Sequence, residues 1–198
     1  MRYLSIDLEA TGLNQNDLII EFGMIPFDTE SACLQEDLSR HFFIQCPTFE
    51  DLRPRLDKWV IDHNEALIRR AHGEGIALTQ FRQEMQKYLE RSDVQSYFKN
   101  PKNERIALFG KSMNAIDLPF LERDLGWDFM RKNFHHRILD LTPVSYALVD
   151  LKILPPECTS GSELMKYLGH GEVAHTALAD AKNTALMYLT LLKLFKKS

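Results

Sequence analysis

Residues 3–13 read YLSIDLEATGL and combine a short apolar run with two acids and a turn. We expect residues 3–8 to form a β-strand, because apolar, aromatic and β-branched side chains favour strands. Asp7 and Glu9 are two residues apart, so on a strand their side chains point to the same face. Adjacent carboxylates repel each other, and burying them is costly without a cation. The segment therefore predicts either a divalent-metal site or, more simply, two solvated acids at an exposed strand end.

Two more apolar segments follow this strand. Residues 17–27 read DLIIEFGMIPF and residues 39–46 read SRHFFIQC. Clusters of Gly, Asn, Asp and Ser separate the three runs, which is typical of strands joined in a meander. We therefore expect three antiparallel strands in the N-terminal quarter of the chain.

The pattern then changes from strands to helices that alternate with short strands. Apolar residues at helical spacing predict a helix around residues 78–89, preceded by a shorter one over residues 65–71. Residues 106–109 predict a buried strand closed by Gly110, residues 115–125 a helix, and residues 138–141 the start of another strand or helix. Residues 176–195 carry a long apolar stripe at intervals of three and four. This order predicts an α/β protein with a mixed sheet flanked by helices.

The size and charge of the chain restrict its class. A length of 198 residues without an internal repeat predicts one domain over residues 1–198, and residues 100–104 are expected to be a loop within it. The 24 basic and 28 acidic residues give a net charge of −4, which disfavours a protein that holds long nucleic acids by charge alone. An enzyme that concentrates carboxylates around metal ions remains compatible with this charge.

The sequence also predicts where the protein resides. Its apolar runs are too short to cross a bilayer, and Asp7 lies where a signal peptide needs an apolar stretch, so we expect a cytoplasmic protein without a membrane segment. Cys33, Cys46 and Cys158 lack CxxC spacing and are interpreted as reduced thiols, without a disulfide framework or a zinc site.

A second acidic motif lies after the strand predicted at residues 106–109. Residues 108–121 read LFGKSMNAIDLPFL, so a short polar loop leads from Gly110 to Asp117 at the start of a helix. The GKS triplet within it suggests a P-loop, but that motif requires glycine at position 105, which is Arg105. We therefore reject a nucleotide-binding P-loop and retain Asp117 as a candidate ligand.

A third motif, HTALADAK, begins at His175 and includes Asp180. Five residues of helix turn through about 500°, so the two side chains cannot share one helical face. They can converge if His175 lies on the loop before the helix and Asp180 lies in its early turns. Taken alone, His175 is more simply a surface or capping residue, and Asp180 a first-turn acid favoured by the helix dipole.

The three motifs together, in this order, resemble the DnaQ-like (DEDDh) 3′–5′ exonuclease superfamily, which has a ribonuclease H-like fold. The resemblance spans residues 7 to 180, and His175 points to the histidine branch. Ser112 stands where members often carry asparagine. Asp140 stands where members often carry an aspartate that supports the site indirectly.

The resemblance implies a two-metal mechanism, with Mg²⁺ or Mn²⁺ ions ~3.5–4 Å apart. Asp7 would bridge the two ions, Glu9 and Asp180 would hold the ion that binds the attacking water, and Asp117 would support the second ion. His175 would act as general base, since its intrinsic pKa is near neutral. The backbone of Ala10, Thr11, Gly12 and Leu13 would seat the 3′-terminal nucleotide of a single strand, with Leu13 as a wedge against the base.

Several alternatives stay open or are disfavoured. A zinc site built from His135, His136 and Asp140, or from His170 and His175, lacks four ligands at the usual spacing. The alternative functions are a non-catalytic nucleic-acid-binding protein on the same fold and a proofreading module held by a polymerase. DNA and RNA are both candidate substrates, and a homodimer and a polymerase partner both stay open.

Overall fold

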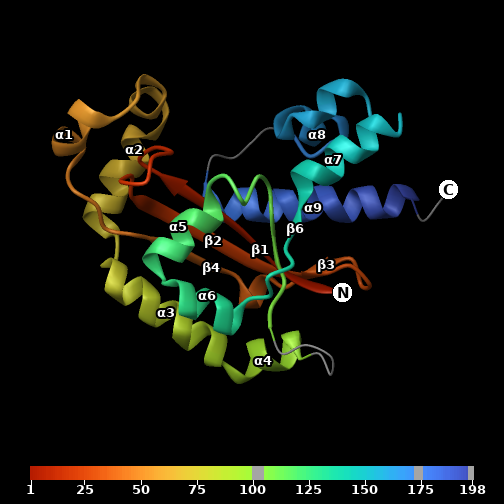
Figure 1. The fold of residues 1–198 in the computed structure, drawn as a ribbon, viewed down its shortest axis with the longest axis horizontal. Coiled ribbons are helices and arrows are strands. Elements are labelled where there is room, and N and C mark those ends of the chain that lie inside the picture. The colour runs from red at the N-terminus through yellow and green to blue at the C-terminus, as the bar shows by residue number, and fades with distance from the viewer. Residues whose placement is uncertain (100–104, 172–175, 196–198) are drawn as a thin grey trace.

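The computed structural model describes residues 1–99, 105–171 and 176–195. A mixed sheet forms its centre (Figure 1), in the order β3-β2-β1-β5-β6, with β4 paired to β2. The strands are β1 Arg2–Ala10, β2 Ile19–Asp28, β3 Cys33–Leu34, β4 Arg40–Phe43, β5 Leu108–Gly110 and β6 Leu139–Asp140. The structure therefore confirms the predicted α/β class with antiparallel and parallel strands.

The antiparallel half of the sheet forms as the N-terminal sequence predicts. β1 and β2 pair along nearly their whole lengths, and the register shifts between Glu9 and Ala10. β4 is shorter than the predicted strand at residues 39–46: the backbone amide of Ile44 still donates to the carbonyl of Ile20 on β2 at 3.0 Å, but Ile44 then forms an isolated bridge with Ile76 and the strand ends. The two-residue strand β3 was not predicted, since so short a segment carries no readable period.

The parallel half adds β5 beside β1 and β6 beside β5. β5 lies two residues later than predicted, because Ile106 pairs with Phe134 outside the sheet. Residues 138–141 contain both the end of a strand and the start of a helix. Asp140 ends β6 and also caps α7, Leu141–Asp150, by accepting a hydrogen bond from the backbone amide of Thr142 at 2.9 Å.

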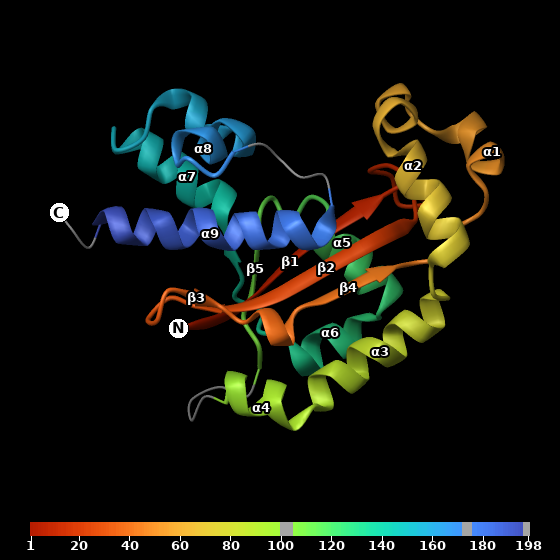
Figure 2. The same cartoon turned by 180° about the vertical axis from the view of Figure 1, so that it is seen from behind.

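Helices cover both faces of the sheet, as Figures 1 and 2 show from opposite sides. On one face α9, Ala177–Phe195, lies across β1 and β2 and packs with α7 and with α8, Gly161–Tyr167, around Phe27 and Phe109. The opposite face carries α3 Leu78–Glu90, α5 Asp117–Asp124 and α6 Trp127–Asn133. The two faces have separate apolar cores, which fixes the sheet between two layers of helices.

A third group of helices packs against the N-terminal end of β2, around Ile20. α2, Lys58–Glu74, is much longer than the helix predicted at residues 65–71, because its buried side chains recur at helical spacing from Val60 to Ala71. The remaining elements are α1 Phe49–Leu52, α4 Ser92–Phe98 and the 3-10 turns η1 Glu36–Leu38, η2 Arg53–Arg55 and η3 Pro156–Thr159. Within the three described ranges, no helix combines the length and the apolar character needed to cross a bilayer.

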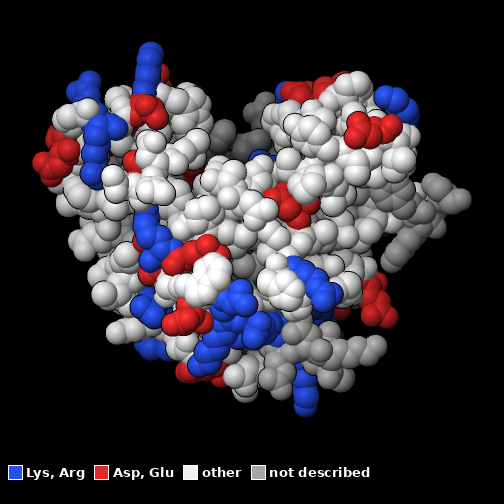
Figure 3. Space-filling view, in the orientation of Figure 1, with Lys and Arg blue, Asp and Glu red and all other residues white. Residues whose placement is uncertain are grey.

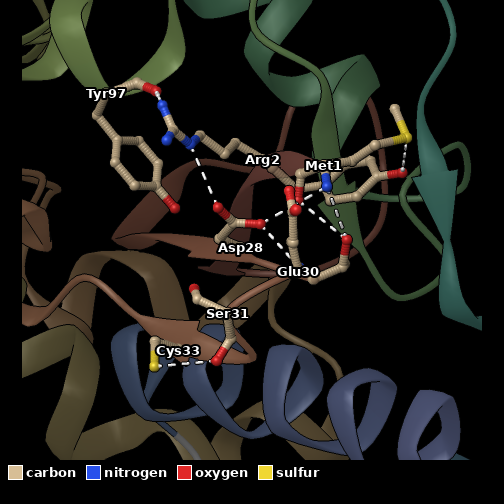
Figure 4. A network of polar contacts seen from close by, with 9 residues as sticks. Met1, Arg2, Asp28, Glu30, Ser31, Cys33 and Tyr97 are labelled. Carbon is tan, nitrogen blue, oxygen red and sulfur yellow. Dashed lines mark hydrogen bonds and ion pairs between the residues drawn. The ribbon is translucent and has the colours of Figure 1, made fainter. Parts of the chain in front are cut away.

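Polar contacts fix the sheet at the N-terminal end of β1 (Figure 4). Arg2 and Asp28 face each other across β1 and β2, and Nε of Arg2 lies 3.3 Å from Oδ2 of Asp28. The guanidinium of Arg2 also donates to the backbone carbonyl of Tyr97, which ties α4 to the sheet. The amino terminus lies 3.6 Å from Asp28. These contacts anchor β1 at the end opposite to Asp7 and Glu9.

Helix α9 approaches the sheet unusually closely at Gly23 of β2. A Cβ atom on Gly23 would lie 2.2 Å from the backbone nitrogen of Leu178 and 2.4 Å from the carbonyl carbon of Ala177. The hydroxyl of Ser5 on β1 donates to the backbone carbonyl of Ala181 at 2.7 Å. The first turn of α9, which contains Asp180, is therefore held directly against β1 and β2.

The close packing at Gly23 predicts that Gly23→Ala is destabilising. The added methyl group must displace backbone atoms of α9, and such overpacking costs roughly 1–3 kcal/mol. The melting temperature should fall by about 2–4 °C for each kcal/mol in a protein of this size. Gly73→Ala is the matched control, since a Cβ there meets nothing within 4 Å and alanine favours the helix. Equal melting temperatures for the two variants, measured by calorimetry, would contradict the close approach.

Candidate metal and active site

Three carboxylates from distant parts of the chain meet at the C-terminal end of β1. Asp7 and Glu9 come from β1 and Asp180 from the first turn of α9, and one oxygen of each lies within 4.8 Å of the others. All three residues are partly buried. The structure thus places Asp7 and Glu9 on the same face, as their spacing predicts, and adds a third acid that only the packing of α9 can bring there.

Asp117 lies next to this cluster but is not one of these three residues. It begins α5, and it is 5% exposed. Its charge acts strongly on Asp7, and the backbone amide of Leu8 on β1 hydrogen-bonds to its carboxylate. The second acidic motif therefore delivers its aspartate to the same strand end, beside the cluster.

Burial and mutual repulsion favour the neutral forms of these acids. Burial, followed by the charges of Asp117, Glu9 and Asp180, raises the pKa of Asp7 well above its ordinary range. Burial and then the charges of Asp180 and Glu21 raise the pKa of Glu9 to about 7. Burial likewise raises the pKa of Asp117 to about 7, against the opposing effect of two backbone hydrogen bonds. The site gathers more negative charge than the protein itself neutralises.

Two charged neighbours were not predicted from the sequence. Lys111 follows Gly110 at the end of β5, and its charge lowers the pKa of both Asp7 and Glu9. Gly161 makes room for this side chain, because a Cβ there would lie 2.8 Å from Cδ and 2.9 Å from Nζ of Lys111. The lysine is visible in the sequence only as part of the rejected P-loop pattern.

The second unpredicted neighbour, Glu21, is fully buried opposite Glu9 in the register of β1 and β2. One of its oxygens is hydrogen-bonded to Nε2 of His41, and the other has no hydrogen-bond partner among the described residues. The sequence signal for Glu21 is that a glutamate interrupts the apolar run of residues 17–27. Its negative charge adds to the demand for cations at Glu9.

The loop after β1 is shaped by the side chain of Asp17. This carboxylate accepts hydrogen bonds from the hydroxyl of Thr11 at 3.3 Å and from the backbone amide of Asn14 at 2.7 Å. Gly12 is required here, because a Cβ would lie 2.4 Å from Oδ2 of Asp17. Leu13 is 73% exposed at the tip of the loop, as a residue that contacts a ligand must be.

Two further tethers hold the site loops in place. Arg123 of α5 donates to the backbone carbonyls of Gln15 and Asp17 at 2.6 and 2.8 Å, which joins the loop after β1 to the helix that carries Asp117. Asp140 accepts hydrogen bonds from the backbone amides of Ser112 and Met113 at 2.9 and 2.8 Å. The structure thus shows how Asp140 acts on the loop before Asp117, although its effect on activity stays a prediction.

The predicted histidine and the alternative zinc ligands have different outcomes. His175 lies outside the described residues, so its role continues to rest on the motif. Nε2 of His170 is hydrogen-bonded to the hydroxyl of Thr190 at 2.9 Å. His135 and His136 stack on each other beside α6 rather than at the carboxylate cluster. The cluster itself offers only oxygen ligands, which suit Mg²⁺ or Mn²⁺ better than zinc.

The raised pKa values predict a stability that depends on pH and on divalent cations. A carboxyl group whose pKa is higher in the folded state stabilises the fold below its ordinary pKa, and this contribution is lost as the pH rises through the folded value. In a chelator, the melting temperature should therefore fall between about pH 5 and pH 8. Added Mg²⁺ or Mn²⁺ should restore it at pH 8, because binding to the folded state alone is stabilising. An ion effect that is the same size in Asp7→Asn would contradict binding at this cluster.

The fold has clear relatives among solved structures of nucleases. It superimposes on the cell-death related nuclease CRN-4 with a TM-score of 0.68 at 16% identity, over 98% of this chain and 64% of that one. It superimposes on the nuclease domain of 3′hExo, a DEDDh family member bound to rAMP, with a TM-score of 0.67 at 15% identity, over 97% of this chain and 92% of that one. S. pombe Pop2p, in a form with Mg²⁺ and Mn²⁺ bound, gives a TM-score of 0.68 at 13% identity, over 99% and 85%.

Sequence comparison adds nothing to this likeness. No protein-family model matches the chain, and no curated protein matches its sequence. The chain spans just under two thirds of CRN-4 and nearly all of the 3′hExo domain. At this low identity the likeness concerns the fold, and it confirms the fold that the three motifs predict. The chain therefore has the DnaQ-like, ribonuclease H-like fold of the DEDDh 3′ exonucleases.

Proposed function

We propose that residues 1–198 form a single metal-dependent 3′–5′ exonuclease domain, which releases nucleoside monophosphates from the 3′ end of single-stranded nucleic acid. The observation that carries the proposal is the meeting of Asp7, Glu9 and Asp180 within 4.8 Å, with Asp117 beside them. Such a cluster is costly unless cations neutralise it. Its acids are also those that the nuclease motifs single out.

The four carboxylates would divide the task of holding two divalent ions. Asp7 is the central acid, since the charges of Asp117, Glu9 and Asp180 all act on its pKa, and it would help to hold both ions. Glu9 and Asp180 would hold one ion and Asp117 the other. When bound, Mg²⁺ or Mn²⁺ makes water nucleophilic and offsets charge on the attacking and leaving oxygens. His175 is assigned the role of general base that removes the proton from the attacking water.

The loop after β1 would position the terminal nucleotide. Its backbone from Ala10 to Leu13 leads directly from Glu9, and the exposed Leu13 would contact the terminal base. The tethers from Asp17 and Arg123 keep this loop in a fixed place relative to Asp117. Such pre-organisation matters because catalysis depends on the alignment of the reacting groups.

The structural relatives support the same reaction class. The 3′hExo domain is described as a DEDDh family member bound to rAMP, and the S. pombe Pop2p structure contains Mg²⁺ and Mn²⁺. A nucleoside monophosphate and divalent ions are the product and the cofactors that we propose here. The substrate of this chain, DNA or RNA, is part of the proposal to be tested.

The first functional prediction concerns metal dependence and polarity. With Mg²⁺ or Mn²⁺, a 5′-labelled single strand should give a descending ladder, and a bulky 3′ block should slow its appearance. Excess chelator should abolish the activity. Asp7→Asn should lower the rate by about 100-fold, since even residues that only support metal ligands cost about 10–100-fold when changed and Asp7 would hold both ions directly. Undiminished cleavage in chelator, or equal cutting of circular and linear strands, would contradict the proposal.

A matched acid controls for the change of charge. Asp93 of α4 is an exposed aspartate paired with Arg91, and it lies outside all three motifs. Asp93→Asn should keep a normal rate, since an exposed ion pair contributes little to the structure. A rate loss in Asp93→Asn as large as that in Asp7→Asn would show that loss of negative charge alone, and not loss of a ligand, is responsible.

The second functional prediction concerns His175. His175→Ala should lower turnover by about 10²–10⁴-fold, the usual contribution of a general base, while the melting temperature changes little. Turnover should fall more than substrate affinity, because the proton transfer matters in the transition state. Higher pH should partly restore the rate. His72→Ala, which removes a histidine bonded to the carbonyl of Cys46, is the control. Normal turnover in His175→Ala would remove this residue from the mechanism.

A further inference from the structure

A groove lies where α5 and α6 meet the parallel edge of the sheet at β5 and β6. It has a volume of about 340 Å³, within the range typical of ligand sites. We name it the α5–α6 groove and define it by the side chains that the argument uses: Arg105, Trp127, Arg131, His135 and His136. None of these residues takes part in the mechanism proposed above.

The groove presents flat, partly exposed rings over an apolar floor. Trp127 is 55% exposed, and the guanidinium of Arg131 lies 5.2 Å from the centre of its ring. The rings of His135 and His136 stack with their centres 4.5 Å apart and an angle of 25° between them. Buried apolar side chains, including Phe134, form the floor. Such surfaces suit a planar ligand, because a base can stack on an aromatic ring or on a guanidinium plane.

The charge of the groove differs from that of the whole protein. Two arginines and two histidines line it, against a single carboxylate, Glu122. Figure 3 shows Lys and Arg gathered on this face of the molecule, although the chain has a net charge of −4. Desolvation and then the charges of His136, Arg137 and Arg105 lower the pKa of His135, so this imidazole is neutral near pH 7 and the positive charge of the groove comes from its arginines. The groove is therefore suited to an anion.

The groove begins next to the proposed catalytic centre. Asn114 and Leu118 line one end of it, and Asp117 lies between them in the chain. Asp117 is buried towards the carboxylate cluster, whereas Asn114 and part of Leu118 face outwards. The lining residues Asn114 and Leu118 are therefore close in the chain to Asp117, the acid of the second motif.

We propose that the α5–α6 groove binds the single-stranded polynucleotide on the 5′ side of the nucleotide that is removed. The combination of flat rings, arginines and a start beside Asp117 matches a strand of alternating bases and phosphates better than a lone anion. This inference rests on the proposed nuclease function, because it concerns the path of the same substrate. It makes the enzyme sensitive to substrate length through residues remote from the metal ligands.

The test uses the full chain and compares a dinucleotide with DNA and RNA strands of 12 nucleotides (12-mers). Arg131→Glu should raise KM for the 12-mers about tenfold or more and leave kcat and the dinucleotide reaction unchanged. Trp127→Ala should raise KM for the 12-mers about fivefold, because one base can no longer stack on the indole ring. Lys87→Glu on α3 is the matched control, since it makes the same charge change at an exposed position. The 12-mer whose KM rises more, DNA or RNA, is the strand that the groove binds.

A second measurement separates the groove from the proposed activity. Binding of fluorescent 12-mers in chelator, followed by anisotropy, reports affinity without any cleavage. The milder Arg131→Gln should weaken this binding and reduce the slope of log affinity against log salt concentration by about one. If the wild-type protein binds the 12-mers in this way but never cleaves them, the proposed nuclease function is contradicted and the proposed binding in the groove is supported. Unchanged 12-mer binding in both folded variants, or an equal loss on the dinucleotide, would overturn the groove.

Discussion

The contact between α9 and the sheet at Gly23 is the constraint on which the site depends. Because Gly23 has no Cβ atom, the backbone of Ala177 and Leu178 approaches β2 more closely than any other residue at this position would allow. Ser5 then fixes the helix to β1 through the carbonyl of Ala181. Because Asp180 lies in this first turn of the helix, the same packing brings its carboxylate to those of β1. Close packing and charge concentration therefore arise from one contact.

Hydrogen bonds hold the loops around these acids in place, although the acids repel each other. Asp17 and Arg123 join the loop after β1 to α5, and Asp140 holds the loop before Asp117. These tethers hold the carboxylates in place although burial, and after it the repulsion between the acids, raises the pKa values of Glu9 and Asp117. The gathered carboxylates are the feature on which the proposed cation binding rests.

The sequence predicted those features that depend on local period or on spacing. The facing pair Asp7 and Glu9 follows from the twofold repeat of a strand, and Asp117 could be placed because the chain turns into a helix there. The length of α2 and the existence of α6 and α8 were not predicted, since short amphipathic segments depend on their partners. Lys111 and Glu21 were missed for a related reason. Their importance depends on pairings between strands and loops that no local pattern shows.

The most direct test of the central claim is to locate manganese in the protein. Crystals soaked in Mn²⁺ and measured by anomalous diffraction would show where ions bind. The account predicts two anomalous peaks among Asp7, Glu9, Asp117 and Asp180, and their loss in Asp7→Asn. The absence of any peak at this cluster, at an Mn²⁺ concentration that supports hydrolysis, would contradict the claim that the packing of α9 assembles a metal centre.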